Sequence, residues 1–171
     1  MLNGTHVELP AMLDCREQRV QLQKKYSETY QAPLLSFCLN IPGPVKTNDA
    51  LRQVFDTAMQ EIRQILAKNG IGILAADERH APTGDEALFA LHGKAADIKA
   101  LMTQLEEKHP LGRLFDLDVL DEQLTKLSRP TPRRCLLCSA QAQACARSRR
   151  HSVDELTDHI DKLVNAFLRS Q

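Results

Sequence analysis

The sequence predicts an α+β domain with a split βαβ, ferredoxin-like arrangement: an antiparallel sheet with both of its helices on one face. Between residues 34 and 128, apolar runs and amphipathic stretches alternate in the order strand, helix, strand, strand, helix, strand. The hydrophobic fraction of 43% is enough for a core, and 171 residues correspond to one domain. One further helix is expected at each end of the chain.

The first 32 residues are expected to form an N-terminal helical segment, with a helix over roughly residues 10–29. Arg16 and Arg19 lie on this helix, which ends before Pro33 because proline cannot continue it. Its apolar face is weak and consists of Leu9, Met12, Leu13 and Val20.

The α+β core is expected to begin with a buried strand over residues 34–39. A rigid turn follows at residues 41–46, because proline restricts φ and glycine supplies unusual backbone angles. Thr47 or Asn48 then caps a helix that runs to about Lys68. The apolar positions of this helix recur at helical spacing and are Leu51, Val54, Phe55, Ala58, Met59, Ile62, Ile65 and Leu66.

Two more strands are expected at residues 71–76 and 87–91, separated by a loop over residues 80–85 that contains proline and glycine. A second helix follows over about residues 94–108 and ends before Pro110. Its apolar face consists of Ala95, Ile98, Leu101, Met102 and Leu105.

The last strand of the core, residues 113–120, contains Asp116 and Asp118 within an otherwise apolar run. Because side chains alternate along a strand, both carboxylates point to the same side, with Cα atoms roughly 6.5 Å apart. Two anions at that distance repel by roughly 2.5 kcal/mol at an effective dielectric constant of about 20. Residues 124–127 are expected to pair with this strand across a turn.

A divalent cation turns this repulsion into attraction, and oxygen ligands suit Mg²⁺. A pair of carboxylates that holds Mg²⁺ against a polyphosphate is typical of phosphoryl and nucleotidyl transfer. The alternative interpretation of Asp116 and Asp118 is a turn at a strand end with two solvated carboxylates.

Residues 129–151 form an Arg/Cys-rich segment. No aspartate or glutamate occurs from residue 129 to residue 150, and the arginines there are Arg129, Arg133, Arg134, Arg147, Arg149 and Arg150. The whole chain balances 22 basic against 22 acidic residues. In such a neutral protein, a local basic segment indicates either a specific anionic ligand or a solvated basic loop.

The same segment contains a C-x₂-C-x₆-C-x₅-H pattern formed by Cys135, Cys138, Cys145 and His151. Three thiolates and an imidazole are a ligand set for tetrahedral zinc, and neighbouring arginines favour the thiolate form. Two alternatives stay open: the cysteines are core residues, or one of them is a catalytic thiol. Cys15 and Cys38 lie outside this pattern and are expected to be packing residues.

A C-terminal helix is expected over residues 152–169. Ser152 and Glu155 have the spacing of a capping box at its start. Its apolar face consists of Val153, Leu156, Ile160, Leu163, Val164 and Phe167.

The composition argues against several classes of protein. The lack of tryptophan and an aromatic content of 4% argue against a stacking platform for single-stranded nucleic acid. No apolar run approaches the ~20 residues needed to cross a bilayer, and residues 1–10 lack the features of a signal peptide. We therefore expect a cytoplasmic protein without membrane or nucleic-acid partners, whose five cysteines are reduced.

Two long motifs in the second half of the chain carry a family resemblance. The first is HPLGRLFDLDV at residues 109–119, and the second is PRRCLLC at residues 132–138, followed by CAR at residues 145–147 and a histidine. Both resemble signatures of the citrate lyase holo-acyl-carrier-protein synthases, which are apo-citrate lyase phosphoribosyl-dephospho-CoA transferases. The resemblance covers roughly residues 30–160.

Residues 42–46, with the pattern PGPxK, and residues 83–86, with the pattern TGxE, resemble weaker blocks of the same family. The resemblance implies a single catalytic domain over residues 1–171. It implies transfer of the 2′-(5″-phosphoribosyl)-3′-dephospho-CoA group from triphosphoribosyl-dephospho-CoA to a serine of the acyl carrier subunit of citrate lyase. Diphosphate is the leaving group.

The related malonate decarboxylase synthases are thought to use a paired-aspartate nucleotidyltransferase motif, to which Asp116 and Asp118 correspond. The resemblance therefore also implies an alternative fold class, a nucleotidyltransferase-like α/β domain. In either fold, Asp116 and Asp118 are the candidate catalytic residues and the expected ligands of Mg²⁺. The candidate phosphate-binding residues are Lys46, Arg113, Arg133, Arg134 and Arg147.

Other roles and functions stay open. His109 is either a base or a structural cap, and Arg149 and Arg150 are candidates for contact with an acidic carrier subunit. If the chain is not this enzyme, the alternatives are a non-catalytic module that binds the carrier subunit and a zinc-stabilised nucleic-acid-binding domain. Release of diphosphate from the precursor distinguishes the enzyme from both.

Overall fold

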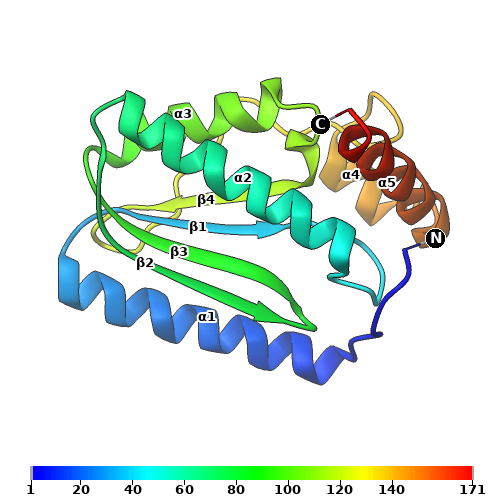
Figure 1. The fold of residues 1–171 in the computed structure, drawn as a ribbon, viewed down its shortest axis with the longest axis horizontal. Helices are drawn as coiled ribbons and strands as arrows, with labels where there is room; N and C mark the ends of the chain where they lie inside the picture. Colours follow the sequence, from blue (N-terminus) through cyan, green and yellow to red (C-terminus); the bar gives the residue numbers. More distant parts are fainter. Residues whose placement is uncertain (1, 171) are drawn as a thin grey trace.

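The computed structural model describes residues 2–170, which form a four-stranded sheet and five α-helices (Figure 1). In chain order the elements are α1 Leu9–Tyr30, β1 Leu34–Leu39, α2 Asp49–Lys68, β2 Gly72–Ala81, β3 Gly84–His92, α3 Ala95–Lys108, a 3₁₀ turn Gly112–Leu114, β4 Phe115–Leu120, α4 Ala142–Arg147 and α5 Val153–Leu168. None of the helices in this range is long and apolar enough to span a bilayer.

The sheet has the strand order β2-β3-β1-β4, and every pair of neighbours is antiparallel. α2 connects β1 to β2 and α3 connects β3 to β4, so that each connection passes over one intervening strand. This is the split βαβ arrangement, with α2 and α3 on one face (Figure 1). The predicted α+β fold class is confirmed, and the sheet is not that of the α/β alternative.

The main core lies between the sheet and the helices α2 and α3. Strand alternation directs Phe37, Phe89 and Phe115 to this side, where they join Phe55 of α2 in one buried cluster. Phe37 stacks on Phe55 with ring centroids 4.9 Å apart and meets Phe115 edge to face. These aromatic contacts fix the position of β4 relative to β1 and α2.

α1 covers the opposite face of the sheet (Figure 1). One half of this face is apolar, and there Leu22 and Tyr26 of α1 pack against Leu34, Leu88, Ala90 and Leu120. The other half is polar, and its sheet residues are Ser36, Cys38, Glu86, Asp116 and Asp118. The polar half is the part of the sheet that can bind a charged ligand.

The side of α1 that faces the sheet differs from the prediction. Leu9, Leu13 and Val20 were expected to form its apolar face, but they are 68%, 52% and 46% exposed. The helix instead buries Cys15 and half-buries Arg19. The reason is that the sheet surface beneath this part of α1 is polar, so charged and thiol side chains face inward.

The predicted loop at residues 80–85 is wrong. β2 continues to Ala81 and β3 begins at Gly84, so that only two residues form the turn, and Gly84 has a φ of 117° that favours glycine. β2 lies at one edge of the sheet and is mostly exposed. Its second half is therefore polar and lacks the apolar pattern by which a strand is recognised in sequence. α4 was not predicted either.

The other element bounds agree with the predictions to within a few residues. Asn48 caps α2 by accepting a hydrogen bond from the amide of Leu51. Ser152 and Glu155 form the predicted capping box of α5. Residues 124–127 contact β4 through an antiparallel bridge between Leu120 and Lys126.

Candidate active site

The turn that leads into β4 depends on a close contact between backbones. Gly112 follows α3, and a Cβ atom at this position would lie 2.3 Å from the carbonyl oxygen of Glu106. His109 Nδ1 accepts a hydrogen bond from the amide of Leu111 at 3.0 Å, and its Nε2 lies 3.2 Å from Glu61. Burial lowers the pKa of His109. These contacts are those of a structural cap, since both ring nitrogens are engaged by the protein.

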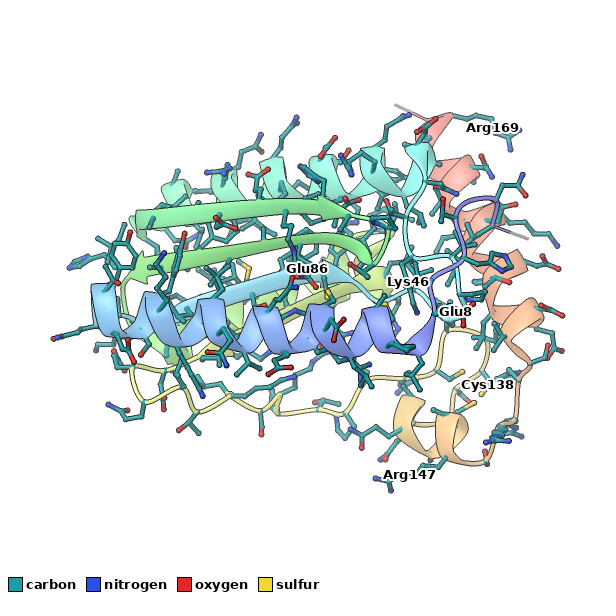
Figure 2. All side chains as sticks on the ribbon, turned by 90° about the horizontal axis from the view of Figure 1, so that it is seen from below. Glu8, Lys46, Glu86, Cys138, Arg147 and Arg169 are labelled. Carbon is teal, nitrogen blue, oxygen red and sulfur yellow. The ribbon has the colours of Figure 1, made fainter. Side chains whose placement is uncertain are left out.

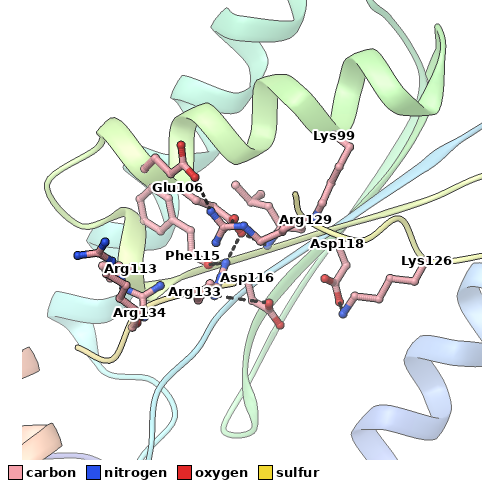
Figure 3. Close-up of polar contacts among 12 residues, drawn as sticks. Lys99, Glu106, Arg113, Phe115, Asp116, Asp118, Lys126, Arg129, Arg133 and Arg134 are labelled. Atoms are coloured by element: carbon pink, nitrogen blue, oxygen red, sulfur yellow. Dashed lines mark hydrogen bonds and ion pairs between the residues drawn. The ribbon is translucent and has the colours of Figure 1, made fainter. Parts of the chain in front are cut away.

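Asp116 and Asp118 leave β4 on the same face of the sheet, as the alternation predicts (Figure 3). Their side chains are 40% and 28% exposed. Asp118 pairs with Lys126 at 2.5 Å, whereas Arg133 Nη1 lies 3.9 Å from Asp116. Burial, together with the charge of Asp118, raises the pKa of Asp116.

The strand register brings a third carboxylate to the same face. Cys38 of β1 is paired with Asp116 on one side and with Glu86 of β3 on the other. Two strand spacings therefore separate Asp116 from Glu86, about 10 Å between Cα atoms. Burial raises the pKa of the Cys38 thiol to about 12. Cys38 thus presents a neutral thiol between two acidic side chains.

Glu86 is held by side chains from α1 and β2. Arg19 Nε donates to Glu86 Oε1 at 3.1 Å, Arg79 Nη2 donates to Oε2 at 2.7 Å, and the Cys15 thiol donates to Oε1 at 3.2 Å. Burial opposes ionisation of Glu86, but these hydrogen bonds and charges lower its pKa below the usual value. Arg19 thereby ties α1 to the polar half of the sheet.

Lys46 approaches this face from the turn after β1. Its Nζ donates to the carbonyl oxygen of Ile41 at 2.7 Å, and burial together with the charge of Arg16 lowers its pKa. A Cβ atom at Gly84 would lie 3.8 Å from Lys46. The segments 42–46 and 83–86 are therefore neighbours, and Figure 2 shows Lys46 and Glu86 on the side that α1 covers.

Arg133 and Arg129 are anchored on the buried Glu106 of α3. Arg133 bonds to Glu106 and donates to the carbonyl oxygen of Phe115 at 2.5 Å, while Arg129 Nη1 lies 3.2 Å from Glu106 (Figure 3). Glu106 also accepts a hydrogen bond from the amide of Leu117 at 3.1 Å. This cluster fastens the segment after β4 to the strand that carries the aspartates.

The remaining arginines lie farther from the aspartate pair. Arg113 bonds to the carbonyl oxygen of Arg134, and both stand at the start of β4 (Figure 3). Arg147 projects from α4 away from Lys46 and Glu86 (Figure 2). The structure thus brings Lys46, Asp116, Asp118 and Arg133 toward one end of the sheet and leaves Arg147 apart.

Sequence reasoning named Asp116, Asp118 and Lys46 but gave no role to Glu86, Arg79 or Arg19. Glu86 and Arg79 lie on strands beyond their predicted ends, and the contact between Arg19 and Glu86 joins residues 67 positions apart. The TGxE block at residues 83–86 was the available signal for Glu86.

The four zinc-ligand candidates come together. The ligand atoms of Cys135, Cys138, Cys145 and His151 all lie within 4.8 Å of one another. A tight turn, closed by a hydrogen bond of 2.7 Å from the amide of Cys135 to the carbonyl oxygen of Ala140, presents the first two cysteines. His151 Nε2 is buried and has no hydrogen-bond partner among the described residues. The group is a possible metal-binding cluster, and this donor set fits a tetrahedral ion.

Comparison with known proteins gives one consistent result. Residues 7–167 match the family model described as apo-citrate lyase phosphoribosyl-dephospho-CoA transferase. A Vibrio cholerae protein named "probable apo-citrate lyase phosphoribosyl-dephospho-CoA transferase" is 39% identical over 166 residues, covering 94% of this chain and 93% of the relative. Proteins with the same name, without "probable", from Escherichia coli and Shigella boydii are each 34% identical over 163 residues, covering 93% of this chain and 89% of the relative.

Proposed function

This chain belongs to the apo-citrate lyase phosphoribosyl-dephospho-CoA transferase family and is a transferase, and we propose that it attaches the phosphoribosyl-dephospho-CoA group to a serine of the acyl carrier subunit of citrate lyase. The serine oxygen attacks the phosphorus next to the ribose in triphosphoribosyl-dephospho-CoA. The P–O bond to serine forms, the P–O bond to diphosphate breaks, and the serine proton is transferred to a base. A phosphodiester links the group to the carrier subunit.

The observation that carries this proposal is the convergence of the family-like segments at one end of the sheet. Residues 42–46 and 83–86 are neighbours beside the polar half of the sheet. Residues 109–119 supply the two aspartates on the same face, and residues 132–138 are bound to the start of β4 through Arg133. A set of carboxylates beside several cationic side chains suits a metal-assisted reaction of a polyphosphate.

The aspartate pair fits a divalent cation. Asp116 and Asp118 lie on one face and are accessible to solvent, and partial burial together with the charge of Asp118 raises the pKa of Asp116. Bound Mg²⁺, held by these two residues, would neutralise charge on the triphosphate and on the leaving diphosphate. One of the two aspartates, or a water molecule held by the cation, would accept the serine proton.

Lys46 is the best placed of the candidate phosphate-binding residues. Its ammonium group bonds to a main-chain carbonyl rather than to a carboxylate, so that its charge is available to a ligand. Arg133 is engaged by Glu106, and we therefore assign it the positioning of β4. Arg113 and Arg134 stay phosphate-binding candidates at the start of β4. Arg147, which projects from α4, stays a candidate for binding either the substrate phosphates or the carrier subunit.

Substitution of the aspartates tests the proposal. We expect Asp116→Asn and Asp118→Asn each to slow transfer to apo-carrier protein at least about 100-fold with Mg²⁺ present, because the cation loses a charged ligand. The measurement is diphosphate release together with the mass of the carrier subunit. Asp56→Asn, on the exposed side of α2, is the matched control and is expected to leave the rate unchanged. Near wild-type transfer by either β4 variant would refute the assignment.

We further propose that the Cys/His cluster holds one structural Zn²⁺ ion. The observation that supports it is the proximity of three thiol groups to the imidazole of His151, whose buried Nε2 has no hydrogen-bond partner within residues 2–170. Three thiolates and one imidazole leave no open coordination position for catalysis in a tetrahedral site. The ion would join the turn at residues 135–140 to α4 and to the start of α5.

The alternative functions are less well supported. Membership of a transferase family argues against a non-catalytic module. No finding favours a nucleic-acid-binding domain, and the expectation of no nucleic-acid partner stays a prediction. The acyl carrier subunit and the triphosphate precursor are the proposed partners. The cytoplasm is the proposed location, a compartment in which the five free cysteines stay reduced.

A further inference from the structure

A cavity of about 570 Å³ lies beyond the end of the sheet, between the Cys/His cluster and α5. Its walls come from the turn after β1, the start of β4, α4 and the first turns of α5, and the proposed function above assigns no ligand to it. Leu114, Leu136, Ala146, Leu156 and Ile160 provide an apolar lining. Its volume is in the range of small-molecule sites.

The charged side chains that line this cavity are cationic. Arg113 and Arg149 line it, and none of its described lining residues is acidic. Arg113 Nε is buried and has no hydrogen-bond partner among residues 2–170. Burial, reinforced by the charges of Arg133 and Arg129, lowers the pKa of Arg113, so that an anion beside it would be stabilised. Apolar walls with two arginines suit a flat aromatic ring that carries phosphate.

The cavity is close to the proposed reaction centre. Arg113 precedes Asp116 by three positions, so that their Cα atoms are at most about 11 Å apart. In the proposed substrate one ribose separates the reacting phosphorus from the adenosine. A ligand that reacts at Asp116 can therefore extend its nucleotide portion into this cavity.

On the premise of the proposed transfer, we propose that the cavity binds the dephospho-CoA nucleotide, with adenine between the apolar walls and the 5′-diphosphate at Arg113 and Arg149. The cavity then determines which triphosphate the enzyme accepts. The Cys/His cluster supplies part of its wall through Cys135, Cys145 and His151, so that the bound nucleotide contacts the metal-stabilised segment.

Binding of 3′-dephospho-CoA to the full chain, measured by isothermal titration calorimetry, tests this inference without any transfer. We expect Arg149→Gln and Ala146→Phe each to weaken binding about tenfold or more, by loss of a charge-assisted hydrogen bond and by filling of the cavity. Arg150→Gln and Ala144→Phe are matched controls, since these neighbours do not line the cavity, and they should bind within about twofold of wild type. Thermal unfolding confirms that each variant is folded.

The outcomes separate this inference from the proposed function. We expect ADP to compete with dephospho-CoA and pantetheine not to compete, and we expect Asp116→Asn to keep its affinity. Three results would overturn the nucleotide site even where transfer is observed. They are unchanged binding in Arg149→Gln and Ala146→Phe, competition by pantetheine alone, and no binding of dephospho-CoA to wild type. Cavity-dependent binding in a protein that transfers nothing would preserve the site and refute the function.

Discussion

Glu86 is a buried carboxylate whose partners come from two other elements. Arg19 of α1 and Arg79 of β2 both bond to it, and they are 28% and 34% exposed. Removing its charge leaves two guanidinium groups without a carboxylate. We expect Glu86→Gln to lower the free energy of unfolding by about 1–2 kcal/mol, less than for a fully buried pair because water screens the arginines.

The neighbouring strand offers the control for this measurement. Glu78 pairs with Arg63 on the surface, with side chains 38% and 44% exposed. We expect Glu78→Gln to change the free energy of unfolding by less than about 0.5 kcal/mol. Urea denaturation of both variants gives the comparison, and equal effects would contradict a structural role for Glu86.

Glu86 and Asp116 make stability depend on pH with opposite signs. The pKa of Glu86 is lowered in the folded protein, so its contribution is present above the unfolded pKa and is lost as the pH falls through the folded value. The pKa of Asp116 is raised, so its contribution is present below the unfolded pKa and is lost as the pH rises through the folded value.

The Asp116 effect predicts a stabilised but inactive variant. At neutral pH, Asp116→Asn removes a charge that partial burial and the neighbouring Asp118 both disfavour, and we expect Tm to rise by about 1–3 °C. The gain is small because the side chain is 40% exposed. Calorimetry at pH 7 and at pH 4 measures it, and the difference from wild type should shrink at the lower pH, because the raised pKa of Asp116 favours its protonated form as the pH falls. A lower Tm for the variant at pH 7 would contradict this account.

The aspartate pair was predictable from sequence because period-two alternation alone places both side chains on one face. The partners of the pair were not. Lys126 and Arg133 reach it through loop geometry, and Arg19 reaches Glu86 through the placement of α1. Such contacts depend on tertiary structure, which no local pattern encodes.

Among the elements, the turn between α3 and β4 depends most directly on one residue type. A Cβ atom at Gly112 would meet the backbone of Glu106 at 2.3 Å, and backbone atoms cannot move aside as a flexible side chain can. We expect Gly112→Ala to cost about 2 kcal/mol or more of stability and to displace the aspartates.

Gly72→Ala is the comparison, because a Cβ atom there would lie 3.5 Å from the nearest heavy atom, which is ordinary contact. We expect this variant to stay within about 0.5 kcal/mol of wild type in urea denaturation. Equal stability of the two variants would show that the backbone near Gly112 can accommodate a Cβ atom without loss of unfolding free energy.

Elements that bury an apolar face were predicted well, and those that do not were predicted poorly. α2 buries Leu51, Val54, Phe55 and Ile62, and its helical spacing was unmistakable. The second half of β2 is exposed and charged, and α4 is six residues long with a short alanine-rich sequence. Neither has enough apolar periodicity for detection.

At the scale of the whole molecule, the Cys/His cluster connects segments that lack a hydrophobic core of their own. We expect purified protein to contain one zinc per chain, and Cys138→Ser to lose it. Because most of the main core lies between the sheet, α2 and α3, chelation should lower Tm and expose residues 129–151 to proteolysis without unfolding the sheet. Elemental analysis, thermal unfolding and limited proteolysis measure these changes.

Cys38→Ala is the matched control for the zinc measurement, since this cysteine lies on β1 outside the cluster. It should keep one zinc per chain. A metal content of zero in wild-type protein, purified without chelators, would leave the cysteines as packing residues.

The strand order also determines which sheet edges are open to other chains. At β4 the chain itself continues pairing through Lys126 and Leu127, whereas β2 has no strand beyond it among the described residues. The second half of β2 carries Asp77, Glu78, Arg79 and His80, and charged side chains on an edge strand disfavour edge-to-edge aggregation between copies. The polar sequence that obscured the strand thus protects the folded protein from self-association.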